Sequence, residues 1–217
     1  MLFAYLLILS AGYVDGYGLF AYGTFLSFMS GNTTLMGYNL GRCRLSAALP
    51  PASAVIGFVV GAAIGSTVSR NAGPRARRIV LAIVAALQAI VLLLTVGGVH
   101  PSPLEIVVLS AGMGMLNRAV TRIGGQSVSL TFVTGTLSQL ANHVSNAIGR
   151  LPLDGAVDAR DSHVRRTTQL AGVWIAFLGG AALGGWVAPR LAEWALAPSV
   201  ALLVVLAFSA NLTSQAS

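Results

Sequence analysis

The sequence has 217 residues, of which 55% are hydrophobic and only 9% are charged, and its mean hydropathy is +0.79. Soluble domains of this size carry about a quarter charged residues, so the composition argues against a soluble protein and indicates a helical membrane protein. The net charge of +7 comes from 13 arginines and no lysine. Because these arginines lie mostly in short loops between apolar runs, they are typical of cytoplasmic anchoring rather than of nucleic-acid binding.

Three apolar spans are predicted in the first half of the chain. The first covers residues 2–22, and residues 23–41 form a stretch that polar side chains interrupt. The Pro50-Pro51 pair is expected to mark a boundary, because proline breaks a helix interior, so the next span is placed at residues 52–69. A loop with four arginines then leads to a span at residues 79–96.

The second half has the same order of elements. It begins near Leu104, and residues 127–149 are again apolar but interrupted by polar side chains. Residues 151–168 form the longest polar connection, and they precede two further apolar spans at residues 170–188 and 192–210. The chain is therefore expected to be an all-α polytopic membrane protein.

Three landmarks recur in the same order and indicate an internal duplication. The sequence Ser-Phe-Met-Ser-Gly-Asn-Thr-Thr at residues 27–34 returns as Thr-Phe-Val-Thr-Gly-Thr-Leu-Ser at residues 131–138. Gly-Arg ends both interrupted stretches, and a Gly-Ala-Ala-x-Gly run follows a phenylalanine at the same distance in both halves. These matches predict two homologous repeats, residues 1–98 and 99–217, within one integral membrane domain.

The distribution of arginine favours an inverted repeat over a parallel one. Three spans per half place both dense basic loops, residues 70–78 and 150–166, on the cytoplasmic side, in agreement with the positive-inside rule. Four crossings per half would place them on opposite sides. Residues 1–42 and 104–150 are each long for one span and short for three, so we expect one broken or re-entrant helix in each half. Discontinuous helices in inverted repeats typically form transporter sites near the bilayer midplane.

The interrupted motifs have the residue types that start a helix inside a membrane. Ser, Thr and Asn side chains accept hydrogen bonds from free backbone N–H groups, and glycine permits a bend. A helix that begins at mid-bilayer presents N–H donors and the positive end of its dipole, which favours an anion or a solute with a carboxylate. The alternative is that these side chains only join packed helices. The predicted binding residues are Ser30, Gly31, Asn32 and Thr33 in the first motif and Thr134, Gly135 and Thr136 in the second.

Ionisable residues inside apolar segments are further candidates for the site. Asp15 lies inside the first span, and Asn117, beside Arg118, occupies the corresponding position of the second half. An Asp15–Arg118 pair and a protonation of Asp15 coupled to transport are both open, as are an interfacial Asp15 and an Arg118 that reaches the cytoplasmic face. His143 lies on a polar helix face and is a candidate coupling residue, with a hydrogen-bonded helix residue as the alternative.

Two paired signatures resemble those of the YoaK family, the DUF1275 (UPF0700) membrane proteins. The first is Gly-Tyr-Val-Asp at residues 12–15 with Phe-Met-Ser-Gly-Asn-Thr at residues 28–33. The second is Gly-Met-Leu-Asn-Arg-Ala at residues 114–119 with Thr-Phe-Val-Thr-Gly-Thr-Leu at residues 131–137, although Leu116 stands where glutamine is expected. The resemblance spans nearly the whole chain. It implies a multi-pass protein of the bacterial inner (plasma) membrane, for which transport is the usual suggestion, and it points to the same candidate residues.

The predicted function is a secondary transporter or facilitator of a small polar solute, with an anion among the candidates, bound at the midplane between two broken helices. An ion or solute channel is the alternative, because facing half-helices also form fixed filters. An enzyme ranks lower, since the sequence has no nucleophile–base pair, metal-ligand cluster or nucleotide motif; a non-transporting membrane scaffold is the fourth class. No cofactor or metal is expected. The expected partners are the solute and the lipid bilayer, and the Gly-xxx-Gly faces suit packing within the repeat or a homodimer.

Overall fold

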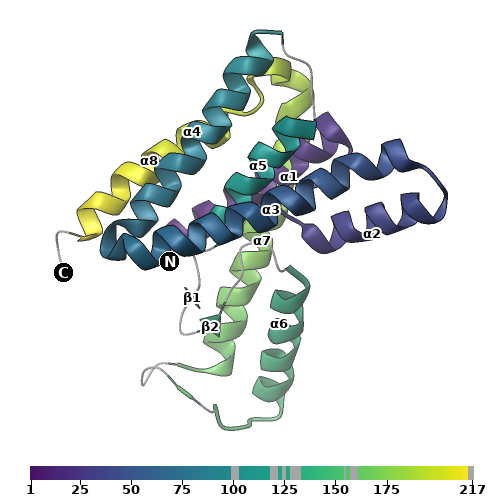
Figure 1. Cartoon of the computed structure of the whole chain (residues 1–217). Coiled ribbons are helices and arrows are strands. Elements are labelled where there is room, and N and C mark those ends of the chain that lie inside the picture. Colours follow the sequence, from purple (N-terminus) through teal and green to yellow (C-terminus); the bar gives the residue numbers. More distant parts are fainter. Residues whose placement is uncertain are drawn as a thin grey trace.

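The computed structural model describes residues 1–98, 103–117, 122–123, 126–127, 133–153, 155–156 and 161–214. These residues are almost entirely helical, with one antiparallel pair of two-residue strands (Figure 1). The elements are α1 (Leu2–Tyr22), α2 (Met29–Gly41), α3 (Leu45–Asn71), η1 (Gly73–Arg75), α4 (Ala76–Val96), α5 (Pro103–Leu116), β1 (Arg122–Ile123), β2 (Gln126–Ser127), α6 (Val133–Ile148), α7 (His163–Leu191), η2 (Ala192–Trp194) and α8 (Ala197–Ser214).

Four helices in the described part of the chain are long and apolar enough to cross a membrane: α1, α3, α4 and α7 with its η2 extension. Two further helices, α5 and α8, are apolar but shorter. The observed α1 has the predicted bounds, and α4 begins three residues before its predicted span. The prediction of an all-α polytopic membrane protein is confirmed.

The start of α3 differs from the prediction, because the Pro50-Pro51 pair lies inside this helix rather than before it. Pro51 has no N–H group to donate to the carbonyl of Ala47, four residues earlier. The Nδ2 atom of Asn39 in α2 donates to that carbonyl instead, at 3.3 Å. The predicted boundary was wrong because a side chain from the preceding helix satisfies the group that proline leaves free.

The start of α7 also lies earlier than predicted, at His163, within the segment that we expected to be a polar connection. The Ser162 hydroxyl caps this helix by accepting a hydrogen bond from the Arg165 N–H group at 3.2 Å. The side chain of Arg166 forms a salt bridge of 2.7 Å with Asp161, just before the helix begins. These capping contacts begin the helix well before its apolar part.

The first helix of each half packs against the third helix of the other half, α1 against α7 and α5 against α3. A Cβ atom at Gly12 in α1 would overlap the backbone of Phe177 in α7, and one at Gly114 in α5 would overlap the backbone of Phe58 in α3. Phe58 and Phe177 occupy matching places in the two predicted repeats. The two helix crossings are therefore equivalent, and in both the backbones touch without intervening side chains.

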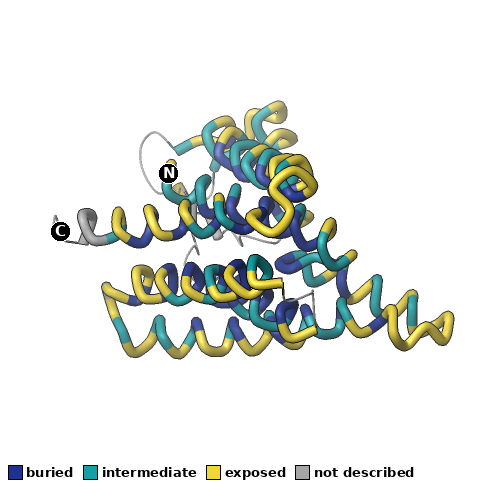
Figure 2. Tube along the Cα trace, turned by 90° about the horizontal axis from the view of Figure 1, so that it is seen from above, coloured by how far each residue is buried: buried dark blue, intermediate teal, exposed yellow. Residues whose placement is uncertain are grey.

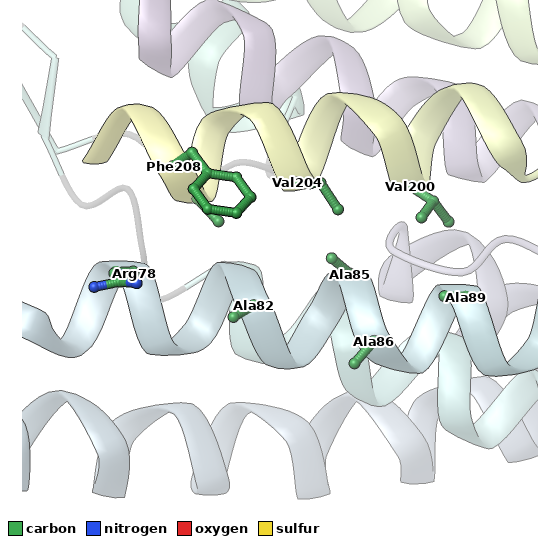
Figure 3. A pocket seen from close by; sticks show the side chains of 9 residues that line it. Arg78, Ala82, Ala85, Ala86, Ala89, Val200, Val204 and Phe208 are labelled. Atoms are coloured by element: carbon green, nitrogen blue, oxygen red, sulfur yellow. The ribbon is translucent and has the colours of Figure 1, made fainter. Parts of the chain in front are cut away.

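The last helices of the two halves, α4 and α8, lie side by side and antiparallel. In Figure 3, Val200 of α8 lies opposite Ala89 of α4, and Val204 lies opposite Ala85. The residue number thus rises along one helix as it falls along the other. This antiparallel pair connects the two halves at a second place, apart from the glycine crossings.

Two hairpin arms project from the region where the helices cross (Figure 1). One consists of α2 and the first part of α3, and the other of α6 and the first part of α7. Figure 2 shows that buried residues gather at the crossings, while exposed residues follow the outer faces and the ends of the arms. The exposed side chains include large apolar ones, such as Ile56 on α3 and Leu93 on α4, which suits helices surrounded by lipid.

Candidate functional site

The helical chain is interrupted between α1 and α2 by a non-helical break, residues 23–28. Gly23 ends α1 with a positive φ of 65°, a conformation that glycine adopts without strain. Non-helical backbone within a membrane protein is tolerated only where its N–H and C=O groups find partners. Two buried side chains, Asp15 and Asn32, supply those partners from opposite sides of the break.

The Asp15 carboxylate, only 3% exposed, binds the second part of the break. Its Oδ1 atom accepts hydrogen bonds from the N–H groups of Leu26 at 2.8 Å and Ser27 at 2.6 Å. Its Oδ2 atom accepts one from the Ser27 hydroxyl at 2.7 Å, and the Phe28 N–H group also points to the carboxylate. Asp15 thus occupies the place that a bound anion would take at the start of α2.

The Asn32 side chain, which is fully buried in the first turns of α2, binds the first part of the break. Its Oδ1 atom accepts hydrogen bonds from the Thr24 hydroxyl at 2.8 Å and from the Phe25 N–H group at 3.0 Å. Its Nδ2 atom donates to the Phe25 carbonyl at 2.7 Å. The amide of Asn32 therefore acts as the hydrogen-bonding partner that a neighbouring helical turn would otherwise provide.

A cavity of about 210 Å³ adjoins Asp15, where α1, the break and α7 meet. Among its lining residues, Asp15 carries the one charged group and the others are apolar, three of them phenylalanines. A carboxylate beside aromatic rings suits a ligand with a positive charge or N–H donors and a small apolar body. The lining residues are Asp15, Gly16 and Leu19 of α1, Phe25 and Phe28 of the break, and Phe177, Ala181 and Gly185 of α7.

The other predicted residues of the first motif do not line this cavity. Ser30 and Thr33 are exposed, and the Thr33 hydroxyl donates to the Met29 carbonyl of its own helix at 2.9 Å. Gly31 lies against the ring of Phe28, where a side chain would collide with it. Of this motif, Asn32 is the residue that the structure brings to the break.

The second motif lies at the start of α6, where Thr136 is buried, Gly135 is half-buried and Thr134 is exposed. Asn117 is half-buried directly after α5. Arg118 and residues 128–132 lie outside the described residues. The predicted Asp15–Arg118 pair and the predicted meeting of two breaks therefore stay predictions.

His143 pairs with a second histidine and does not line the Asp15 cavity. Its Nδ1 atom lies 2.8 Å from the Nδ1 atom of His163, so one ring donates a hydrogen bond to the other. The pair connects α6 to the first residue of α7. The sequence does not predict a role for His163, because it lies within residues 151–168, which are expected to form a polar connection.

Glu105 is a buried acid that the sequence analysis missed. It lies in the first turn of α5, near the side chains of Tyr17 and Tyr22. Those two hydroxyls lie 3.4 Å apart. The signal in the sequence was weak, because Glu105 stands at the start of an apolar segment, whereas Asp15 lies in the middle of one. Among the described residues, no three His, Cys, Asp or Glu side chains converge in a way that could hold a metal ion.

Comparison with known proteins gives consistent matches. The sequence profile of a family described as "Protein of unknown function (DUF1275)" matches residues 3–209. The UPF0700 transmembrane protein RA0705 of Rhizobium meliloti (strain 1021) is 32% identical over 200 residues, which cover 91% of this chain and 80% of that protein. The UPF0700 transmembrane protein YoaK of Bacillus subtilis (strain 168) is 30% identical over 152 residues, or 67% of this chain and 66% of that protein. No solved structure matches.

Proposed function

The chain belongs to the DUF1275 family, and from this premise we propose that it is a secondary transporter, or facilitator, of a small polar solute in the bacterial plasma membrane. The observation that carries the proposal is the buried Asp15 carboxylate at the edge of a cavity between α1 and α7. Carboxylates in membrane-spanning helices are costly and typically mark a substrate or ion pathway.

The walls of the cavity belong to different halves of the chain. Asp15 and the break come from residues 1–98, whereas Phe177, Ala181 and Gly185 come from residues 99–217. A small displacement of α7 along α1 would therefore change the size and the access of the cavity. A site between two repeats is the arrangement in which rocking of one repeat against the other gives alternating access.

An inverted repeat is part of this proposal, and the antiparallel α4–α8 pair supports it. These two helices hold the same place in the two halves. Helices related by a twofold axis along their own direction would be parallel, whereas an axis perpendicular to them makes them antiparallel. An axis perpendicular to spanning helices lies in the membrane plane and inverts the topology of one half.

The cavity favours a solute with a positive charge or N–H donors over an anion. The backbone N–H groups that an anion would need at the start of α2 already donate to Asp15. The Asp15 carboxylate can still accept a hydrogen bond from a ligand, and three phenylalanines lie beside it. Both features are complementary to a small amine. The substrate class that we propose is therefore a small organic amine or a zwitterion that presents its ammonium group to Asp15.

Counterflow in proteoliposomes tests this proposal with a mixture of isotope-labelled small amines and amino acids, read out by mass spectrometry. We expect saturable exchange for the solutes that carry an ammonium group, and its loss in Asp15→Asn. Loss of pH-driven accumulation with intact counterflow would instead assign Asp15 to proton coupling. An unsaturable current would support a channel and contradict the carrier.

A matched pair of glycine variants in α7 shows whether solutes pass through the cavity. Gly185 lines the cavity and has open space at its Cβ position, so Gly185→Leu should fill the cavity and block exchange. Gly179 also has open space at its Cβ position but does not line the cavity, so Gly179→Leu should exchange normally. Equal exchange in the two variants would exclude this route.

A further inference from the structure

A second cavity, of about 310 Å³, opens between α4 and α8 and shares no lining residue with the Asp15 cavity (Figure 3). Ala85 and Ala207 are buried at its floor, while Ala86 and Phe208 are exposed at its rim. Arg78 lies at one end of this groove. The lining residues are Arg78, Ala82, Ala85, Ala86 and Ala89 of α4 and Val200, Val204, Ala207 and Phe208 of α8.

We propose that this groove binds one acyl chain of an anionic phospholipid, with the lipid phosphate bound by the guanidinium group of Arg78. The groove combines an apolar channel of suitable shape with a cation at one end only. This proposal is independent of the transported solute, because the groove lies outside the Asp15 cavity.

The length of the groove fits one leaflet of a bilayer. Arg78 and Ala89 are eleven residues apart in α4, which corresponds to about 16 Å along a helix. The hydrocarbon core of a bilayer is about 30 Å thick, so one leaflet occupies about 15 Å. An acyl chain whose headgroup is at Arg78 would therefore extend along the alanines and end near the middle of the membrane.

The charge at the Arg78 end is complementary to a phosphate group. Arg75, Arg77 and Arg78 are all exposed at the start of α4, and Arg70 precedes them at the end of α3. The sequence has no acidic residue between Asp15 and Glu105. Arginine binds phosphate oxygens through paired N–H donors. A zwitterionic lipid has the same phosphate but also an ammonium group, which the surrounding arginines repel, so the cluster prefers a headgroup with a net negative charge.

The shape of the groove also explains why an acyl chain would enter it. All the α4 residues that line the groove, apart from Arg78, are alanines. This strip of small side chains faces the larger Val204 and Phe208 of α8. A void beside exposed apolar side chains in a bilayer is filled by the surrounding lipid, because an empty space forfeits dispersion contacts. The flexible acyl chain is the component of the bilayer that matches a narrow channel.

Native mass spectrometry of the purified full chain tests the proposal, with phosphatidylglycerol and phosphatidylcholine of identical acyl chains as probes. We expect the wild type to retain one phosphatidylglycerol with about tenfold preference over phosphatidylcholine, the factor that a charge-assisted contact of ordinary strength gives. Arg78→Gln should abolish the preference. Ala86→Phe, which fills the groove from its rim, should abolish retention of both lipids.

The matched controls are Arg44→Gln and Ala63→Phe, which change an exposed arginine and an exposed alanine outside the groove. Both should retain lipid as the wild type does. All four substitutions affect exposed residues, so an unchanged melting temperature checks that the fold persists. Equal retention of the two lipids, or an unchanged preference in Arg78→Gln, would overturn the proposal. A dimer that Ala86→Phe dissociates would also overturn it, since a second copy would then occupy the groove.

Discussion

At the scale of residues, two buried polar side chains hold the same six residues of non-helical backbone from opposite sides. Asp15 binds residues 26 and 27, and Asn32 binds residues 24 and 25. An unsatisfied backbone group costs several kcal/mol in the hydrocarbon core, so the break can persist only with such partners. The binding role that we propose for Asp15 therefore rests on a structural role that it already has.

Asn32→Ala should destabilise the protein more than any change at the exposed face of α2. It removes three hydrogen bonds and leaves the part-buried N–H and carbonyl groups of Phe25 without this partner. We expect the free energy of unfolding to fall by about 1–3 kcal/mol, measured by SDS titration in mixed micelles. The control is Thr34→Ala, because the Thr34 hydroxyl is exposed and donates only to the Ser30 carbonyl of its own helix. A loss as small as that of the control would show that Asn32 does not hold the break.

The sequence identifies Asp15 and Asn32 as exceptional, because each is polar within an apolar surrounding. It does not predict their partners, which are backbone groups of an irregular segment seven to twelve residues away along the chain. A turn of regular helix allows such partners to be predicted from spacing, whereas an irregular segment does not. Ser30 and Thr33 are polar like Asn32 and lie in the same turns of α2, but they are on its exposed side, whereas Asn32 is buried.

At the scale of elements, glycines set how closely the helices approach. Gly180 in α7 lies against the backbone of Leu9 in α1, and Gly61 in α3 lies against the backbone of Ala111 in α5. In a membrane, where lipid is as apolar as the helix surface, close packing and not burial from water drives association. The spacing of these glycines was visible in the sequence. Their partner helices were not, because a small-residue face fits any other helix.

Two adjacent glycines of α7 provide a direct test of this packing. Gly180→Val should destabilise the protein by about 3 kcal/mol, the upper end of the usual cost of overpacking, because the new side chain would overlap the Leu9 backbone. Gly179→Ala should be neutral or stabilise it by about 0.5–1 kcal/mol, because its Cβ position is open and alanine favours the helix. Size-exclusion profiles and melting temperatures of the solubilised variants measure the difference. Similar profiles for both would mean that α1 and α7 do not touch at this crossing.

Helix ends were predicted less well than helix interiors, for reasons that lie in particular side chains. The apolar runs locate α1 and α4 within a few residues. The ends of α3 and α7 depend on Asn39 and Ser162, which satisfy backbone groups beyond the apolar run. Hydropathy alone does not predict these contacts.

At the scale of the whole molecule, the orientation of the two halves is the decisive feature. An inverted repeat places the loop after α3 and the segment before α7 on the same side of the membrane. A parallel repeat places them on opposite sides. The reciprocal glycine crossings show which helices meet, and labelling from one side of the membrane determines the orientation.

Cysteine labelling in whole cells distinguishes the two orientations. Cys43 is exposed in the loop between α2 and α3, and the inverted repeat predicts that a membrane-impermeant thiol reagent modifies it from outside. In a Cys43→Ser background, Asn71→Cys and Ala156→Cys, both at exposed positions, should be modified only after permeabilisation. Modification of one of these two positions from outside would contradict the inverted repeat.

The exchange of partners between the halves bears on how the protein is made. While the ribosome has synthesised only residues 1–98, α1 and α3 are present but α7 and α5, which their glycine faces contact, are not. Until then, the glycine faces of α1 and α3 are exposed to lipid. Each of these faces could pack against any nearby helix that has small residues. Correct assembly then depends on the second half arriving on the same chain, which keeps its local concentration high.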